Sequence, residues 1–231
     1  MPARTVIVSG GAGGVGLAIT QRFASEGHRV FVVEREAVRA HLDPHLSDRI
    51  SFVAADVTDE ASVVAAMGQV QQATGRLDVL VNVVGGYAAG QPISELAAAT
   101  WDHMMNLNLR SAFLMAKHAV PPMIAHDWGR IINFSARAAR DTAANAGAYA
   151  VSKAGVLALT EVQAKEVLAH NITVNAVLPS IVDTAANRTA MPDADFAHWP
   201  KAEEIAGVVA FLASEAAGLI SGAGIPVYGR G

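Results

Sequence analysis

The sequence of 231 residues contains no cysteine. This absence excludes disulfides, thiolate nucleophiles and cysteine-based zinc sites, and it is typical of proteins in a reducing compartment. The sequence also lacks a basic block and any apolar run near the length of about 18 residues that a membrane-spanning helix needs. The net charge is −4, so we expect neither nucleic acid nor a membrane as a partner. These absences predict a cytoplasmic protein that acts on a small molecule.

Metal and hydrolase sites have little support in the sequence. His41 and His45 have the spacing of metal ligands on a helix, but Pro44 between them disfavours that helix. No serine, histidine and aspartate have a spacing that argues for a hydrolytic triad. We therefore expect no metal site and no hydrolytic chemistry.

A glycine-rich segment follows the first predicted strand. Residues 5–9 form a β-branched run that leads into residues 10–16, and a helical pattern then continues through Phe23. A glycine turn lets the backbone approach a pyrophosphate, whose charge meets the N–H groups at the start of the helix. The pattern predicts a dinucleotide-binding βαβ unit. The residues expected at the phosphates are Ser9, Gly10, Gly14, Val15 and Gly16.

The second predicted strand, residues 29–33, is followed by an acidic residue. Glu34 can accept hydrogen bonds from the ribose hydroxyls of the adenosine half, and its charge would repel the additional phosphate of NADP(H). Arg35 stands beside it and could instead attract that phosphate. The sequence therefore favours NAD(H) as the cofactor and leaves NADP(H) possible.

Strands alternate with helices along the whole chain. Further strands are predicted at residues 50–54, 77–84, 130–134, 172–178 and 225–228. A long helix is expected at about residues 94–118, ending before Pro121, and Thr58 or Asp59 is expected to cap the helix that reaches Thr74. This alternation predicts one α/β domain over residues 1–231, with a doubly wound parallel sheet of about seven strands and helices on both faces.

Tyr149 and Lys153 stand four residues apart in a predicted helix, so their side chains project from one face. A cation about 5 Å from a phenol would lower the phenol pKa from about 10 toward neutrality. Such a tyrosine can give or take a proton near neutral pH. The pair therefore predicts acid–base chemistry.

Two loops supply candidate substrate contacts. Tyr87 follows the strand at residues 77–84 and is either a stacking surface for a substrate or an aromatic ring packed under a loop. The loop at residues 183–200 is a natural lid and carries Asn187, Arg188 and Trp199. The alternative for these three residues is a segment held by its own packing and hydrogen bonds.

Taken together, these motifs resemble the short-chain dehydrogenase/reductase family over essentially the whole chain. The matching segments are Ser9-Gly10-x-x-x-Gly14-x-Gly16, Asn108 and Tyr149-x-x-x-Lys153. Asn82-Val83-Val84-Gly85 resembles a degraded form of the family's Asn-Asn-Ala-Gly, and Pro179-Ser180 stands where the family usually has Pro-Gly. The resemblance implies a Rossmann-type fold, a nicotinamide cofactor, and a homodimer or homotetramer.

The resemblance also implies roles for the matching residues. Tyr149 would supply a proton, Lys153 would lower its pKa and hold the nicotinamide ribose, and Asn108 would anchor a water of the proton relay. The other residues implied at the cofactor are Asp56 and Val57 at the adenine, Asn82, Gly85, Pro179, and Ile181 and Thr184 at the nicotinamide carboxamide.

One catalytic position departs from the family pattern. The family has a serine thirteen residues before the tyrosine, where this chain has Ala136. Ser135 is adjacent, but neighbouring residues of a strand point to opposite faces, so Ser135 can replace it only if the backbone turns there. Without that donor, an unactivated ketone would lose about 3 kcal/mol of transition-state stabilisation.

A second resemblance is to the quinonoid dihydropteridine reductase branch, which also has alanine at this position. It rests on residues 85–90, 136–139 and 183–199, and Asn108 is a departure from it. The sequence is therefore interpreted as a reductase that transfers hydride to an activated C=N or C=O group. The alternatives are an ordinary carbonyl reductase or alcohol dehydrogenase, and a nicotinamide-binding protein that has lost catalysis.

Overall fold

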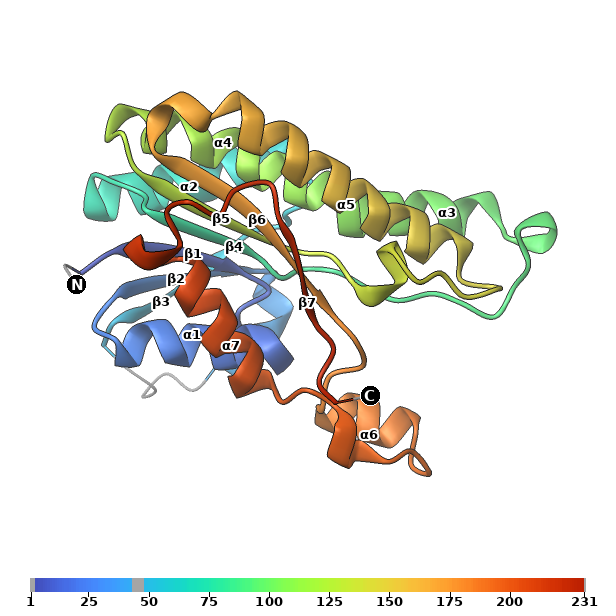
Figure 1. Ribbon diagram of the computed structural model, residues 1–231. Helices are drawn as coiled ribbons and strands as arrows, with labels where there is room; N and C mark the ends of the chain where they lie inside the picture. The colour runs from blue at the N-terminus through green and yellow to red at the C-terminus, as the bar shows by residue number, and fades with distance from the viewer. Residues whose placement is uncertain (1–2, 43–47, 231) are drawn as a thin grey trace.

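The computed structural model of the protein describes residues 3–42 and 48–230, so the expectation about His45 lies outside the described residues. Its centre is a parallel sheet in the order β3-β2-β1-β4-β5-β6-β7 (Figure 1). The strands are β1 Thr5–Ser9, β2 Arg29–Glu34, β3 Ile50–Ala54, β4 Val79–Asn82, β5 Gly129–Phe134, β6 Ile172–Pro179 and β7 Gly224–Val227. The predicted doubly wound parallel sheet is confirmed.

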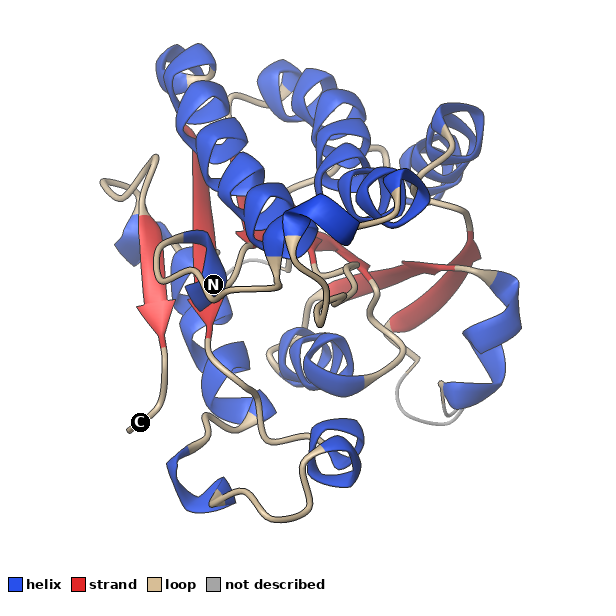
Figure 2. Cartoon of the chain, turned by 90° about the vertical axis from the view of Figure 1, so that its right-hand side faces the viewer, coloured by secondary structure: helices blue, strands red, loops and turns tan. Residues whose placement is uncertain are grey.

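Helices cover both faces of this sheet, as the two views show (Figures 1 and 2). The α-helices are α1 Gly14–Ser25, α2 Glu60–Thr74, α3 Ala98–Met104, α4 Ser111–Ala125, α5 Gly147–Glu166, α6 Ala185–Ala190 and α7 Ala202–Leu212. Shorter helical segments are η1 Glu36–His41, η2 Ile93–Glu95, η3 Met105–Arg110, η4 Arg137–Ala139, η5 Leu168–His170, η6 Phe196–His198 and η7 Glu215–Ala217. None of the helices in the described ranges is long and apolar enough to span a bilayer.

The hydrophobic core forms two layers, one on each face of the sheet. Along β1, Val6 and Val8 belong to the layer that contains Phe23 of α1. Ile7 between them belongs to the opposite layer, which contains Met115 of α4. This alternation follows from the pleat of a strand, whose successive side chains point to opposite faces. Because both faces are covered, the strands are rich in apolar residues, and polar residues within them such as Asn133 and Asn175 are buried.

The central strand β1 lies where the strand order reverses. It pairs with β2 on one side and with β4 on the other. Ligands of open α/β sheets bind at such a point, beyond the carboxyl ends of the strands. The glycine turn that follows Ser9 therefore lies where a ligand is expected.

The amino-terminal half of the long predicted helix differs from the expectation. The chain forms the 3-10 turn η2 at residues 93–95, and the helix begins only at Ala98. It then passes through the π-helical segment η3 before continuing as α4. A π segment accommodates one additional residue in a helix and is frequent at functional sites. Periodicity alone does not reveal such an insertion.

The carboxyl-terminal end of the same helix also corrects the prediction. It does not stop before Pro121, because α4 continues to Ala125 with Pro121 and Pro122 inside it. Each proline removes one backbone N–H donor from the helix. Met123, in the last turn, is fully buried in the core. Packing of this turn against the core stabilises the helix beyond the prolines.

Strand β4 is shorter than the predicted strand at residues 77–84. Before it, the Asp78 side chain accepts a hydrogen bond from the Thr5 amide at 2.7 Å. After it, the Val83 amide still donates to Ser9 O, and Gly85 and Gly86 then lead into the loop that carries Tyr87. At α2, the cap is Asp59, which accepts from the Ser62 amide.

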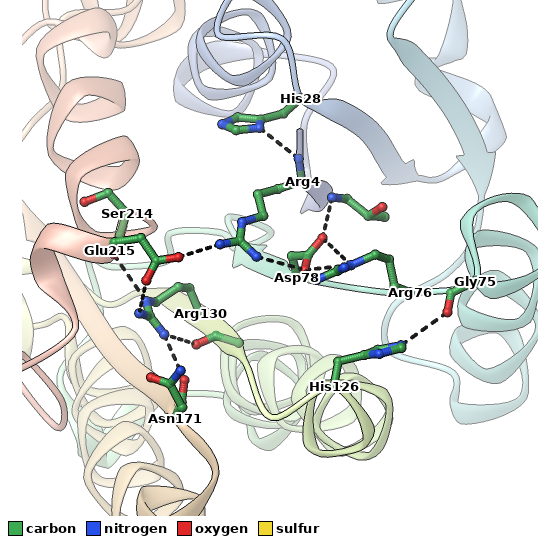
Figure 3. A network of polar contacts seen from close by, with 12 residues as sticks. Arg4, His28, Gly75, Arg76, Asp78, His126, Arg130, Asn171, Ser214 and Glu215 are labelled. Atoms are coloured by element: carbon green, nitrogen blue, oxygen red, sulfur yellow. Dashed lines mark hydrogen bonds and ion pairs between the residues drawn. The ribbon is translucent and has the colours of Figure 1, made fainter. Parts of the chain in front are cut away.

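A charged network closes the amino-terminal edge of the sheet (Figure 3). The buried carboxylate of Asp78 pairs with Arg76 and Arg4. The guanidinium groups of Arg4 and Arg130 contact the ring of Trp128, at 3.7 and 4.3 Å from its centroid. These residues lie just before or at the start of β1, β4 and β5. Because the glycine turn lies at the opposite edge, we assign this network to stability.

Candidate active site

The glycine turn after β1 forms a cradle without side chains. A Cβ atom on Gly16 would lie 2.0 Å from the carbonyl oxygen of Gly10. Gly10 itself has a φ of +74°, a conformation that favours glycine. Within the described ranges, no atom lies within 4 Å of the place that a Cβ would take on Gly13 or Gly14. The turn is therefore closely packed at Gly16 and open next to Gly13 and Gly14.

Helix α1 begins at this turn and adds a positive dipole end. Gly13 at the N-cap has no side chain to occupy the first N–H groups, and the first turn of α1 has no acidic residue. Val15 is partly exposed there, whereas Ser9 is buried. Exposed N–H groups at the positive end of a helix bind phosphates. The turn thus fits the pyrophosphate of a dinucleotide.

The residues expected at the adenosine half stand at neighbouring strand ends. Glu34 ends β2, is partly exposed, and accepts the Arg35 amide at 3.2 Å. Asp56 follows β3, where the hydroxyl and amide of Thr58 donate to its carboxylate at 2.6 and 2.9 Å. These bonds hold the pKa of Asp56 below its usual range. Val57 is buried beside it. The contacts of Glu34 with a ribose, and of Asp56 and Val57 with an adenine, stay predictions.

Tyr149 lies in the first turn of α5 and contacts the ring of Tyr87. The two ring centroids are 4.9 Å apart with an interplanar angle of 76°, an edge-to-face contact. Tyr149 is half-buried, whereas Tyr87 is 72 % exposed. Burial, and secondly the Tyr87 phenol, raises the pKa of Tyr149 to about 12. Tyr149 is therefore a protonated phenol at neutral pH.

Lys153 is buried one turn further along α5. Its Nζ donates to the carbonyl oxygen of Phe134 at 2.8 Å. A Cβ on Gly85 would lie 3.0 Å from the same Nζ, so the ammonium group also faces the loop after β4. Burial lowers the pKa of Lys153 to about 8. Lys153 is therefore still charged at neutral pH, although burial disfavours its charged form.

The predicted effect of Lys153 on the Tyr149 pKa is wrong for this structure. The residues share one helix face as expected, but the pKa of Tyr149 is raised, not lowered. Desolvation of the phenol is the largest cause, and the Lys153 ammonium group is directed to the Phe134 carbonyl. Spacing predicts which side chains are neighbours, whereas desolvation depends on what the fold packs around them.

Asn108 lies in the π-helical segment η3 and clamps the loop after β4. Its Oδ1 accepts the Gly86 amide at 2.8 Å, and its Nδ2 donates to Gly86 O at 3.1 Å. The same Nδ2 donates to Ser152 Oγ at 2.9 Å, and Ser152 donates to Tyr149 O at 2.8 Å. Asn108 thus links the Tyr87 loop to the helix of Tyr149. The water relay expected at Asn108 stays a prediction.

Ser135 does not replace the missing family serine in this geometry. The backbone remains extended, because the Ser135 amide donates to Val177 O and Ala136 has φ −160° and ψ 163°. Ser135 is buried, and its hydroxyl donates to Lys153 O at 2.7 Å. Its proton is therefore committed to a backbone carbonyl. Ala136 is also buried and has no donor to offer.

Asn82, expected at the cofactor, is buried inside the sheet. Its amide donates to Asn133 Oδ1 at 2.9 Å, and Asn133 donates to Thr160 Oγ1 at 3.0 Å. This chain of hydrogen bonds ties β4 to β5 and α5. Asn82 thus has a structural role, and its contact with a cofactor stays a prediction.

The residues expected at the nicotinamide follow β6. Pro179 ends that strand and is buried, whereas Ile181 is exposed. The Thr184 hydroxyl accepts the Asn187 amide at 3.2 Å and thereby caps α6. These residues lie at the same carboxyl edge of the sheet as the glycine turn. Their contacts with a nicotinamide stay a prediction.

The expected lid contains α6 and η6, which Figure 1 shows set apart from the helical layers. Arg188 forms two hydrogen bonds with Asp183, at 2.6 and 2.8 Å, and its guanidinium group contacts the ring of Phe196. Asn187 donates to Val182 O at 2.9 Å. Trp199 packs on Phe196, with ring centroids 4.9 Å apart. These contacts match the alternative of a segment held by its own packing and hydrogen bonds.

Comparison with known proteins agrees with this geometry. The family model described as short chain dehydrogenase matches residues 4–195. The chain belongs to the short-chain dehydrogenase family. It is therefore an enzyme, an oxidoreductase that uses a nicotinamide cofactor.

Similar proteins extend over nearly the whole of this short-chain dehydrogenase. The 3-oxoacyl-(acyl-carrier-protein) reductase MabA of Mycobacterium tuberculosis is 34 % identical over 235 residues, which cover 98 % of this chain and 92 % of MabA. The D-threitol dehydrogenase of Mycolicibacterium smegmatis is 33 % identical over 246 residues, 99 % and 93 % of the two chains. The solved structure of ElxO with NADP bound has a TM-score of 0.92 at 26 % identity and covers 98 % of each chain.

Two contacts in the site of this dehydrogenase were missed at the sequence level. The Phe134 carbonyl receives the Lys153 ammonium group, and Ser152 joins Asn108 to Tyr149. A serine three residues after Tyr149 could have been found, because such a hydroxyl can bond back to the preceding helical turn. The Phe134 carbonyl has no sequence signal, since every residue carries one.

The buried Lys153 predicts a pH dependence of stability. Its folded pKa is lowered from 10.5 to about 8. Between these values the unfolded chain binds more protons than the folded chain, so stability rises with pH. We expect the unfolding free energy of the wild type to rise relative to Lys153→Met by about 2 kcal/mol between pH 8 and pH 10. Urea unfolding of both proteins over this range, without cofactor, measures it.

The comparison with Lys153→Met cancels the groups that the two proteins share. Tyr149 acts in the opposite sense above pH 10, because its folded pKa is raised. The pH range of the measurement therefore ends at about pH 10. If the unfolding free energies of the two proteins changed equally with pH, the prediction would be contradicted, because burial would then not lower the pKa of Lys153.

Proposed function

We propose that this short-chain dehydrogenase interconverts a carbonyl group and an alcohol on a small molecule, with Tyr149 as the acid–base residue. The observation that carries the proposal is the placement of a protonated phenol and a buried ammonium group one helical turn apart, at the sheet edge that bears the glycine turn. The relatives support the same class of substrate. MabA is a 3-oxoacyl reductase and the Mycolicibacterium protein is a D-threitol dehydrogenase by name.

Carbonyl reduction adds one hydride to carbon and one proton to oxygen. When bound, the reduced nicotinamide supplies the hydride. Tyr149 donates its phenolic proton to the carbonyl oxygen, and its raised pKa ensures that this proton is present at neutral pH. Lys153, one helical turn away, has its ammonium group held on the Phe134 carbonyl and stays the predicted contact of the nicotinamide ribose. Solvent returns the proton to Tyr149 before the next turnover.

The cofactor is proposed to be NAD(H) rather than NADP(H). Glu34 places a carboxylate at the end of β2, where it would repel a phosphate on the adenosine ribose. Arg35 is exposed beside it and keeps NADP(H) possible. ElxO, which has a similar fold, has been solved with NADP bound, and this also keeps NADP(H) open for this chain.

A second candidate is the reduction of an activated C=N group such as that of a quinonoid pterin. Ala136 favours it, because an electrophilic acceptor needs less polarisation than an unactivated ketone. The relatives described above carry names of carbonyl and alcohol substrates, so they support the first candidate. The pterin resemblance therefore stands as the alternative.

A substrate panel tests both candidates. Purified enzyme is assayed with cyclohexanone, a short-chain 3-oxoacyl thioester, vicinal polyols and quinonoid dihydropterin, each with the NAD and NADP forms in parallel. We expect turnover of at least one ketone or alcohol, with a higher kcat/KM for the NAD form. Turnover of the pterin alone would support the second candidate. Absence of turnover with every pair would contradict both.

The expected homo-oligomer stays a prediction, which the molecular mass in solution tests. Two side chains on the outer helices favour it, since Phe113 of α4 and Val162 of α5 are exposed.

A further inference from the structure

The serine hydroxyls near Tyr149 are all occupied. Ser135 donates to Lys153 O at 2.7 Å, and Ser152 donates to Tyr149 O at 2.8 Å. Ala136 presents only a methyl group. If a ketone is reduced here, its oxygen receives a proton from Tyr149 but needs a second donor from elsewhere. An oxygen that gains negative charge in the transition state is stabilised strongly by such a donor.

Tyr87 carries a hydroxyl that the protein does not use. Its ring touches Tyr149 edge to face at 4.9 Å, and 72 % of the residue is exposed. Within residues 3–42 and 48–230, neither phenolic hydroxyl of this pair has a hydrogen-bond partner, in contrast to the two serines. A small molecule bound at the Tyr149 side chain therefore lies near the Tyr87 ring.

The loop that carries Tyr87 is fixed on both sides. Before it, Gly86 exchanges two hydrogen bonds with Asn108, at 2.8 and 3.1 Å. After it, the Gly90 amide donates to Asn145 O at 2.9 Å, where both residues have positive φ. The backbone on both sides of Tyr87 is thus held in place, and its ring rests edge to face on Tyr149. Such preorganisation is what a donor to a transition state requires.

We propose that the Tyr87 hydroxyl donates a hydrogen bond to the substrate carbonyl oxygen and thereby replaces the serine that Ala136 lacks. This inference rests on the proposed carbonyl–alcohol function. Tyr87 polarises the C=O bond and keeps its own proton. The proton that ends on oxygen comes from Tyr149, the hydride that ends on carbon comes from the reduced nicotinamide, and the cofactor is oxidised. Unactivated ketones thus become accessible despite Ala136.

The alternative role of Tyr87 is a stacking surface that needs only its ring. The substitution Tyr87→Phe separates the two roles, because it keeps the ring and removes the hydroxyl. If Tyr87 only stacks, the variant resembles the wild type. If Tyr87 donates, the variant loses transition-state stabilisation.

The experiment compares four variants with the wild type on the best ketone of the panel and on cyclohexanone. We expect Tyr87→Phe to lower kcat about 100-fold with little change of KM. The double variant Tyr87→Phe/Ala136→Ser should recover most of this loss, because serine supplies the donor again. Ala136→Ser alone should raise kcat on cyclohexanone, because the ketone oxygen then has a serine donor in addition to Tyr87. Tyr228→Phe removes the hydroxyl of the third tyrosine and should behave as the wild type.

A second measurement does not depend on turnover. The carbonyl stretch of isotope-labelled cyclohexanone is recorded by infrared difference spectroscopy on enzyme that holds the oxidised cofactor. A hydrogen bond lowers this frequency. We expect a lower frequency in the wild type than in Tyr87→Phe, and a lowered frequency again in Tyr87→Phe/Ala136→Ser.

Unchanged kcat in Tyr87→Phe, or no rescue by Ala136→Ser, would overturn the inference. The proposed function would still stand as long as the wild type turns over a ketone. A wild type that turns over no acceptor at all is a failure of the proposed function instead. In that case the infrared frequency still decides whether Tyr87 polarises a bound ketone. The inference is overturned if the frequencies in the wild type and Tyr87→Phe are equal, or if no ketone binds.

Discussion

Replacing Tyr149 by phenylalanine is expected to lower kcat at least about 100-fold for every substrate that the enzyme reduces. The change removes the phenolic proton and keeps the ring that packs edge to face on Tyr87. The contacts of Lys153 with Phe134 and of Ser152 with the Tyr149 carbonyl also remain, because they involve backbone atoms. The loss should therefore be chemical rather than structural.

The measurement is steady-state kinetics with the preferred cofactor, together with the dissociation constant of NADH from its fluorescence. Cofactor affinity should stay within about twofold of the wild type, because the glycine turn is untouched. Tyr228→Phe serves as the matched control with the same atom removed elsewhere. Retained turnover in Tyr149→Phe would contradict the proton-transfer role.

The second large effect is expected at Gly16. A Cβ there would lie 2.0 Å from Gly10 O, 2.8 Å from Gly10 C and 3.0 Å from Gly11 Cα. These are backbone atoms of the turn itself, so the turn must move to make room. We expect Gly16→Ala to weaken binding of NADH and NADPH by more than about tenfold, or about 1.4 kcal/mol, and to lower thermal stability.

Gly13→Ala is the matched control for this prediction. Gly13 has a φ of −154°, which any residue adopts, and no atom of the described chain lies within 4 Å of the position that the alanine methyl group would occupy. This variant should unfold at a temperature close to that of the wild type. Circular dichroism shows whether Gly16→Ala is folded, and fluorescence titration gives its cofactor affinity. Equal affinity of Gly16→Ala and the wild type would show that the turn does not hold the cofactor.

The sheet was largely predictable because its signals are local. Short apolar runs such as Val6–Val8 are bounded by glycine or polar residues, and both faces of the sheet are covered. The π segment at residues 105–110 and the continuation of α4 through Pro121 were not predictable in this way. Both depend on how the helix packs on the sheet, and tertiary packing overrides local preference.

The active site was predictable as a set of neighbours but not as an electrostatic arrangement. The spacing of Tyr149 and Lys153 correctly placed them on one helix. The predicted direction of the Tyr149 pKa shift was wrong, because burial, and secondly the charge of the Tyr87 phenol, raises this pKa. Likewise, the sequence did not decide whether Ser135 replaces the family serine. Its hydroxyl donates to Lys153 O, and this tertiary contact is visible only in the structure.

The ammonium group enclosed beneath the loop after β4 has a consequence for protein engineering. Its charge costs folding free energy at neutral pH, so variants without it should survive heating better than the parent while they lose catalysis. A library sorted only for heat resistance would therefore enrich inactive clones at Lys153. Any evolution campaign on this enzyme needs a selection for turnover at every round.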